Sequence, residues 1–427
     1  MEQIKMMQNL MRALGSAADF DELISNIGNS RVVMLGEASH GTHEFYYWRS
    51  ELTKRLVAEK GFSFVAVEGD WPDCYRYNRY VKGYDNTSKT AEEIADTYRR
   101  WPRWMWANAE TAEFLDWLRN YNDEKAEPDK VGFYGLDVYS LWDSINAATD
   151  YIQKNHPESL DQAREAYKCF EPYKEDPIGY AYGGRGLPHS CQDEVVNMLV
   201  GLIQAQTAGE HDPEEHFNAE QNAMVAINAE RYYKSMLGGQ AESWNVRDHH
   251  MMGTLQRLME RYGKDAKAII WAHNTHIGDA RATDMADAGM INIGQLVREF
   301  YKDKSYAVGF GTYQGTVIAA DAWDTAAEII EVPPARPESW DGLFHQTVGS
   351  DGYLMLRRLP KVAAAQRTQR AIGVVYHPDR EQYGNYVPTS LAERYDAYIH
   401  IDTTTALNPL SPERADNEVP ETYPTGV

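Results

Sequence analysis

The chain has 427 residues, of which 43% are hydrophobic and 25% are charged, and its formal net charge at pH 7 is −22. This composition is typical of a soluble globular protein with an ordinary apolar core. The negative charge argues against nucleic acid or an anionic membrane as the main partner, because both bind through basic surfaces. No apolar run approaches the roughly 18 residues that a membrane-spanning helix needs, so no membrane partner is expected.

The N-terminal segment, residues 1–14, has apolar residues at helical spacing and predicts an amphipathic helix. It lacks the apolar core and the small-residue cleavage site of a secretory signal, and we therefore expect a cytoplasmic protein. The three cysteines, Cys74, Cys169 and Cys191, show no CxxC spacing. In a cytoplasmic protein they are expected to be reduced thiols rather than a disulfide framework.

Short apolar runs rich in β-branched residues alternate with longer segments of helical periodicity. The runs at residues 31–35, 64–67 and 130–134 are separated by helical segments at 42–59 and 91–120, which is the βαβ order of a parallel sheet. Further strands are predicted at residues 268–271, 306–310, 316–319, 371–375 and 397–401. The sequence therefore predicts an α/β fold with a mostly parallel central sheet flanked by helices.

The middle of the chain, between residues 141 and 262, has helical periodicity without a strand signal. We interpret residues 142–262 as a mostly helical insertion or cap subdomain. Residues 1–141 and 263–405 then form the two parts of the α/β core, and residues 406–427 form an extended or disordered tail. Within the insertion, helices are predicted at 141–155, 160–169, 193–208, 214–237 and 246–262, with a glycine-rich loop at 180–186.

Polar side chains stand at the ends of four predicted strands, where α/β proteins display reactive groups. Glu37 and His40 follow the first strand, and Glu68 closes the second. Because the carboxyl ends of parallel strands meet at one edge of an open sheet, we expect these side chains to line one crevice. The residues placed there by this argument are Glu37, His40, Glu68, Asp137, His273 and His276.

The first strand end places Glu37 three residues before His40, with a glycine on either side of the pair. This spacing predicts either a general base with its orienting carboxylate or half of a metal site. Glu37 by itself could cap the following helix, and Glu68, if buried, must be paired. A structural role explains one of His273 and His276, whereas both together favour a functional site.

Arginine and aromatic side chains could complete the crevice. Arg49 and Arg247 are candidates to stabilise an oxyanion, although isolated arginines are more often salt-bridge partners. The aromatic run at residues 101–106 either packs helices or forms the wall of a pocket for a bulky or sugar-like ligand. On the second interpretation the substrate-binding residues are Trp71, Trp104 and Trp106, together with Asp70, Asp137 and Arg247.

Four motifs carry a resemblance to a known family. They are Gly-Glu-Ala-Ser-His-Gly-Thr-His-Glu-Phe at 36–45, Val-Glu-Gly-Asp-Trp at 67–71, Asn-Val-Arg-Asp at 245–248 and Trp-Ala-His-Asn-Thr-His-Ile-Gly-Asp-Ala-Arg at 271–281. In this order they resemble the erythromycin esterase family, and the resemblance extends over most of the chain. The first and last motifs are more similar to general members, some of which carry a succinoglycan-biosynthesis label, than to the macrolide-resistance enzymes.

The resemblance implies a hydrolase of ester bonds that acts on a small-molecule ester and uses no cofactor. It also implies that His40 is the general base that activates water, and that Glu37 and Glu68 orient and polarise it. The cleft would be completed by Arg49, Arg247, His273 and His276. Opening of macrolide lactones named the family, but the substrate does not transfer with the fold.

Two other functions stay open at the level of the sequence. A metallohydrolase could use the same glutamates and histidines as ligands of Zn²⁺ or Mn²⁺, with a metal-bound hydroxide as the nucleophile. A non-catalytic binder of a glycan or a hydrophobic small molecule could use the aromatic pocket, with the polar groups as anchors. The oligomeric state is not determined by the sequence.

Overall fold

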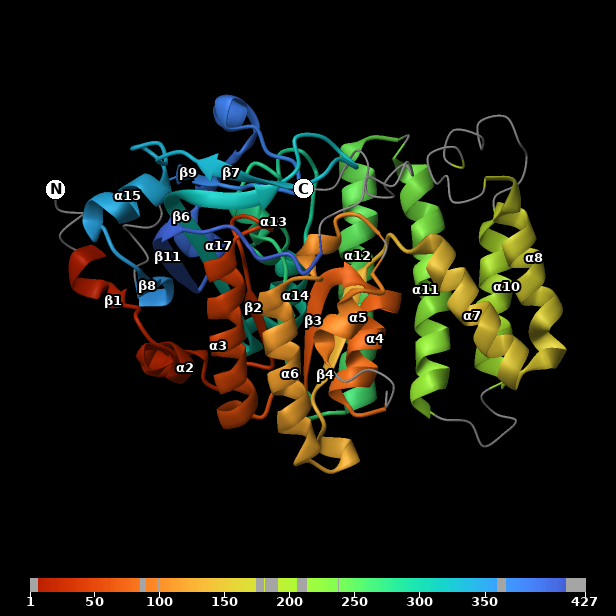
Figure 1. Ribbon diagram of the computed structural model, residues 1–427. Coiled ribbons are helices and arrows are strands. Elements are labelled where there is room, and N and C mark those ends of the chain that lie inside the picture. Colours follow the sequence, from red (N-terminus) through yellow and green to blue (C-terminus); the bar gives the residue numbers. More distant parts are fainter. Residues whose placement is uncertain are drawn as a thin grey trace.

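The computed structural model describes residues 7–84, 90–98, 100–173, 180, 191–205, 213–236, 238–358 and 366–411 (Figure 1). Its main sheet contains β1 (Arg12–Ala13), β2 (Val32–Leu35), β3 (Phe64–Asp70), β4 (Gly132–Asp137), β5 (Ala268–Trp271), β6 (Ser305–Ala319), β7 (Glu328–Val332), β8 (Gly352–Met355) and β11 (Ala397–Thr404). The strand order is β1-β8-β11-β6-β2-β5-β3-β4, and β7 pairs with β6 outside this path. A separate hairpin is formed by β9 (Gln366–Arg370) and β10 (Tyr386–Ser390).

The inner strands of the main sheet are parallel, which confirms the predicted α/β fold. β2 pairs with β5 and β6, β3 pairs with β4 and β5, and β11 pairs with β6, all in parallel. Two antiparallel pairs, β8 with β11 and β1 with β8, lie toward one edge, and the third joins β7 to the end of β6 outside the main strand order. Every residue of β2 is buried, as a parallel strand covered on both faces requires.

Helices cover both faces of this sheet, and alternate residues of each strand face opposite layers. Val33 and Leu35 of β2 belong to one hydrophobic cluster, whereas Val32 and Met34 belong to another. The first cluster includes residues of α2 (Asp21–Ile27), α3 (His43–Lys60), α5 (Ala91–Ala95) and α6 (Ala109–Asp123). The second includes residues of α12 (Gln240–Tyr262), α13 (Asn274–Ile277), α14 (Ile293–Tyr301), α15 (Trp340–Thr347) and α17 (Leu391–Arg394).

Two further helices near the sheet are α4 (Trp71–Val81), which follows β3, and the short α16 (Glu381–Gly384) after the 3-10 turn at Pro378–Arg380. α4 contributes residues to both clusters. Among the described residues, no helix is both long enough and apolar enough to cross a membrane.

A group of helices stands beside the sheet, at the right of Figure 1. It consists of α7 (Leu141–Asn155), α8 (Leu160–Phe170), α10 (Gln192–Ala205) and α11 (Pro213–Ser235), which share a hydrophobic cluster of their own. In the described residues between 141 and 262 there is no strand, as predicted. The predicted loop at 180–186 lies outside the described residues except for Tyr180, and the division into core, insertion and tail stays a prediction.

Several predicted elements are wrong in their extent. Residues 91–120 form two helices, α5 and α6, because the segment between them contains Pro102, which has no backbone N–H for a helical hydrogen bond. The strands predicted at 306–310 and 316–319 are one strand, β6, whose half-exposed middle continues past the core and whose end pairs with β7. The helix predicted for residues 1–14 does not continue to its end, where Arg12–Ala13 form β1.

The prediction of a strand at residues 371–375 is wrong. β9 ends at Arg370, and Ile372 and Val375 take part only in isolated bridges, with Ser39 and Ala320 respectively. The apolar run therefore packs on the core without continuous strand pairing. Leu407 is buried and Ala406 forms a bridge with Thr42, so residues 406–411 lie against the core. Residues 412–427 lie outside the described residues.

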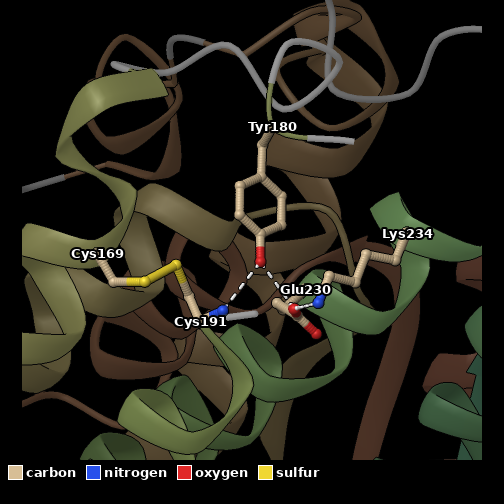
Figure 2. Close-up of a disulfide and its surroundings, with 5 residues drawn as sticks. All are labelled: Cys169, Tyr180, Cys191, Glu230 and Lys234. Atoms are coloured by element: carbon tan, nitrogen blue, oxygen red, sulfur yellow. Dashed lines mark hydrogen bonds and ion pairs between the residues drawn. A yellow bond between two sulfur atoms is a disulfide. The ribbon is translucent and has the colours of Figure 1, made fainter. Parts of the chain in front are cut away.

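The prediction of reduced thiols is wrong for two of the three cysteines. Cys169 in α8 and Cys191, just before α10, form a disulfide (Figure 2). The hydroxyl of Tyr180 accepts the backbone N–H of Cys191 and donates to Glu230. The spacing along the chain gave no signal because the pair forms through the packing of α8 against α10, and Cys74 is a free, buried thiol.

Candidate active site

The candidate active site lies at the carboxyl edge of the parallel strands β2, β3, β4 and β5. Glu37 and His40 follow β2, Glu68 lies within β3 and Asp137 ends β4. His273 follows β5. The expectation that these strand ends bring the polar residues together is met, because neighbouring parallel strands end at the same edge.

A cavity of about 600 Å³, counting the space open to solvent, lies over this edge. Its polar and charged lining residues are His40, Glu68, Asp70, Asp73, Arg100, Asp137 and Arg247. The other large contributors are Tyr98, Trp101, Met105, Trp106, Tyr139 and Trp323. A few convergent polar groups within aromatic walls are typical of a site for a small organic molecule.

His40 is held by a buried carboxylate. Its Nδ1 lies 2.9 Å from Oε1 of Glu37, and both side chains are 1% exposed. An ionised carboxylate only accepts hydrogen bonds, so the neutral imidazole carries its proton on Nδ1. This assignment leaves Nε2 as the basic nitrogen of His40, a residue that lines the cavity.

Glu37 is in turn held by Arg49, whose Nη2 lies 2.7 Å from Oε2. The guanidinium carbon of Arg49 lies 4.3 Å from the ring centre of Tyr46 and 5.1 Å from that of Trp271. Aromatic faces attract a cation, and a desolvated arginine without a carboxylate would be costly. The three side chains Arg49, Glu37 and His40 therefore form one buried chain of contacts that ends at the cavity.

Arg247 of α12 organises the carboxylates on the other side of the cavity. It donates to Asp137 through Nε at 2.9 Å and through Nη2 at 2.7 Å, which is a bidentate arrangement. Nη2 also lies 2.7 Å from Oε1 of Glu68. Burial works to raise the pKa of Asp137, but the charge and hydrogen bonds of Arg247 outweigh it, and the pKa is lowered.

Glu68 connects Arg247 to the histidine strand. Its Oε2 accepts the backbone N–H of His273 at 2.7 Å. Burial works to raise the pKa of Glu68, but the positive charges of His276, when protonated, and of Arg247 lower it. Glu68 therefore stays ionised in the core, where it fixes the start of the segment after β5.

His276 lies behind Arg247 rather than in the cavity lining. Nη1 of Arg247 donates to Nε2 of His276 at 2.9 Å, so the imidazole proton is on Nδ1. Nδ1 lies 3.0 Å from each carboxylate oxygen of Asp248, and the ring stacks on Trp244 with centres 4.5 Å apart. His276 is thus an acceptor that fixes the orientation of Arg247.

His273 is a buried neighbour of His40, with ring centres 4.9 Å apart. Its Nδ1 accepts the backbone N–H of Thr275 at 3.3 Å and lies 2.8 Å from the hydroxyl of that residue. Burial and the positive charges that His40 and His276 can carry lower the pKa of His273 well below its usual value. A neutral imidazole therefore lies against His40.

Close approach at this edge depends on two glycines. A Cβ on Gly69 would lie 2.7 Å from Nε1 of Trp106, which donates to the backbone oxygen of Glu68. A Cβ on Gly36 would lie 2.1 Å from Oδ1 of Asn274. Asn274 donates to the backbone oxygen of Phe310 at 2.6 Å and so ties the segment after β5 to β6.

The predicted aromatic wall is correct only in part. Trp106 lines the cavity, whereas Trp71 and Trp104 are buried in the cores and do not. Asp70 also lines the cavity and forms an ion pair with Arg100. The sequence argument missed Trp101, Tyr139 and Trp323 as lining residues.

Of these three missed residues, only Trp101 had a signal in the sequence, because it belongs to the aromatic run at 101–106. Trp323 lies far away in the sequence and reaches the cavity by ring contact with Trp101, their centres 5.1 Å apart. Asp248, the partner of His276, was adjacent to a candidate in the sequence. The contact between Asp248 and His276 follows from the tertiary structure and not from the sequence.

The alternative of a metal centre was tested on the donor groups. Within the described ranges, no three His, Cys, Asp or Glu side chains are arranged to hold a metal ion. Glu37 is bound to Arg49, and Glu68 to Arg247, so each carboxylate already has a cationic partner. This donor arrangement does not resemble the open ligand set of a catalytic metal site.

Comparison with known proteins decides the family. A sequence model described as erythromycin esterase matches residues 57–404. The chain belongs to the erythromycin esterase family.

Among curated relatives, erythromycin esterase type II of Escherichia coli is 23% identical over 331 residues, which are 70% of this chain and 73% of the relative. A solved structure described as a succinoglycan biosynthesis protein has a TM-score of 0.76 and 21% identity, covering 95% of this chain and 98% of that chain. A mutant of the erythromycin esterase EreC in its open conformation has a TM-score of 0.69 and 16% identity, covering 92% and 97%.

These similarities confirm the family and the fold predicted from the motifs. Membership in this family supports a hydrolase role for the chain. At 16% and 21% identity the solved structures show the fold alone, so the reaction must be argued from the site itself.

Proposed function

We propose that this protein hydrolyses carboxylic esters and that His40 is the general base. The proposal rests on one observation: His40 lines the cavity while its Nδ1 is bound to the buried carboxylate of Glu37, which Arg49 holds in place. An imidazole fixed in this tautomer accepts a proton at Nε2. The carboxylate stabilises the imidazolium that then forms.

The reaction begins when His40 takes a proton from water as the water oxygen attacks the ester carbonyl carbon. A tetrahedral intermediate forms, and the carbonyl oxygen becomes an oxyanion. When the carbon–oxygen bond to the alcohol breaks, the imidazolium returns the proton to the departing alkoxide. The products are a carboxylic acid and an alcohol, and His40 is neutral again.

Arg247 is the group that we assign to the oxyanion. Its contacts with Asp137, Glu68 and His276 use four of its five N–H groups. The remaining N–H, on Nη1, is the available donor on a cation that lines the cavity. A positioned donor of this kind stabilises developing negative charge, and its loss typically costs about 100- to 1000-fold in rate.

The proposal is tested with purified wild type and His40→Ala on short-chain acyl esters, acylated sugars and a macrolide lactone. Wild type is expected to hydrolyse at least one of them, and His40→Ala to lose that activity while still binding the substrate. The matched control is His43→Ala, because His43 lies three residues further on and pairs with Glu110 outside the cavity lining. Full activity in His40→Ala would refute the proposal.

A second measurement separates this mechanism from metal-dependent hydrolysis. After exhaustive dialysis against a chelator, the wild-type rate is expected to be unchanged. A rate that falls and is restored by Zn²⁺ or Mn²⁺ would assign the attacking hydroxide to a metal instead.

A further inference from the structure

A second hollow lies beside the cavity of the candidate active site. It is a groove of about 1600 Å³, counting the space open to solvent, and Asp73 belongs to the lining of both hollows. The groove lies between α4 and α7, and α11, which contacts both, lies between them in Figure 1. A molecule whose ester group is in the cavity can therefore extend past Asp73 into the groove.

The direction of the groove follows from the fold. α4 starts at the end of β3 and α7 starts shortly after the end of β4, so both helices begin at the catalytic edge of the sheet. The groove-lining residues of α7 repeat at helical spacing from Asp143 to Lys154, which is about 16 Å at 1.5 Å per residue. The groove thus runs away from the site along α7.

The groove is lined mainly by polar residues, and their positive and negative charges nearly balance. Its carboxylates are Asp73, Asp143, Asp150 and Glu215, and its cations are Arg76, Arg79 and Lys154. Arg76 is paired with Asp73, and Arg79 with Glu215. A groove with these pairs has no excess charge suited to a polyanion or a polycation.

Amide side chains supply the remaining polar lining. Asn146, Asn155, Asn218 and Asn222 offer both donors and acceptors, which match hydroxyl groups. Asn222 is fully buried, yet its Oδ1 has no hydrogen-bond partner. A buried acceptor without a partner is costly and marks a place where a ligand donor can bind.

From these observations we infer that the substrate is an ester carried on a neutral, polyhydroxylated chain, with the oligosaccharide part in the α4–α7 groove. The inference rests on the proposed esterase function and names the class of its substrate. Sugar hydroxyls bind carboxylate, amide and ammonium groups, and such groups make up the exposed lining of α7. An extended peptide would instead need an open strand edge or apolar pockets.

The test compares the acetyl ester of a monosaccharide with acetylated neutral oligosaccharides of increasing length. For wild type, kcat/KM is expected to rise about tenfold or more with chain length, the effect of one or two good hydrogen bonds. In the double variant Asn146→Ala and Asp150→Ala this gain is lost, while kcat/KM for the monosaccharide ester is unchanged. Both positions are exposed on α7, and the matched control is Gln153→Ala, exposed on α7 outside the groove lining.

A direct binding measurement makes the outcome independent of hydrolysis. Unesterified oligosaccharide is titrated calorimetrically into His40→Ala and into the same protein with the two α7 substitutions. Binding that the α7 substitutions remove supports the inference even if no ester is hydrolysed, in which case only the proposed function fails. Hydrolysis without dependence on chain length, no oligosaccharide binding, or a preference for esterified peptides would overturn the inference.

Discussion

Arg49 and Glu37 form an ion pair inside the protein, with 2.7 Å between Nη2 and Oε2 and side-chain exposures of 0% and 1%. The pair stands directly behind His40, which binds the other oxygen of Glu37. Two buried charges of this kind are stable only as a pair, because removal of one leaves the other desolvated and unpaired. Fold stability and the orientation of His40 are therefore coupled through the same carboxylate.

Replacement Arg49→Met is expected to destabilise the protein by about 3–5 kcal/mol, because Glu37 is left buried without its cation. Adding Glu37→Gln to this variant should restore part of the lost free energy, since a neutral amide replaces the unpaired charge. Urea unfolding of wild type, both single variants and the double variant measures the coupling. If the effects of the two substitutions simply add, Arg49 does not stabilise the protein through Glu37.

Replacement Glu37→Gln alone is expected to lower kcat about 100- to 10,000-fold with little change in KM. The amide neither stabilises the imidazolium of His40 nor holds the Nδ1–H tautomer as firmly. Steady-state kinetics on an ester that wild type hydrolyses provides the measurement, with His43→Ala as the control. An unchanged kcat would remove Glu37 from the proposed mechanism.

Replacement Arg247→Met is expected to abolish activity and to cost about 3–5 kcal/mol of stability, because Asp137 and Glu68 become unpaired in the core. Arg247→Lys should recover part of the stability but little activity, since an ammonium lacks the planar fork that bonds Asp137 twice. Unfolding and kcat/KM are measured in parallel, with His249→Ala, exposed on the same helix, as the control. Wild-type kinetics in Arg247→Lys would contradict the oxyanion assignment.

The stability of the protein should fall in acid partly through His250. Burial, and then the charge of Arg257, lower the pKa of His250 from 6.5 to about 3. The unfolded chain therefore binds a proton that the folded protein does not. The contribution of His250 to the free energy of unfolding is complete above pH 6.5. It declines as the pH falls toward 3, by up to about 1.4 kcal/mol per pH unit.

The measurement is urea unfolding of wild type and His250→Gln at several pH values between about 7 and 5, where this linkage acts. The stability advantage of wild type over the variant should shrink as the pH falls. A constant difference between wild type and His250→Gln would mean that His250 does not carry this acid sensitivity.

The disulfide between Cys169 and Cys191 should leave one reactive thiol in the denatured, unreduced protein, that of Cys74. Reduction should raise the count to three, and Cys74→Ser should lower the unreduced count to zero. Because the two cysteines are separated by 22 positions in the sequence, loss of the bridge is expected to cost about 3 kcal/mol of stability through unfolded-state entropy. Alkylation with mass spectrometry counts the thiols, and three before reduction would exclude the bridge.

The sequence by itself determined the parallel core and the strand ends that carry polar groups. β2, β3 and β5 are apolar runs that a buried strand requires, and the polar groups after them stand out against that pattern. Because parallel strands end at one edge, the meeting of Glu37, His40 and Glu68 follows from the order of the elements. The separate hairpin gave no such signal: its strand β9, for example, consists entirely of polar residues and is short.

Only the tertiary structure decided the contacts between elements that are distant in the chain. Asp248 of α12 is the partner of His276 of α13, and Trp323 reaches the cavity because its loop meets Trp101. The same holds for the buried positions of Trp71 and Trp104 and for the disulfide between α8 and α10. Periodicity and local propensity encode which face of an element is buried, whereas the partner of each side chain depends on how whole elements pack together.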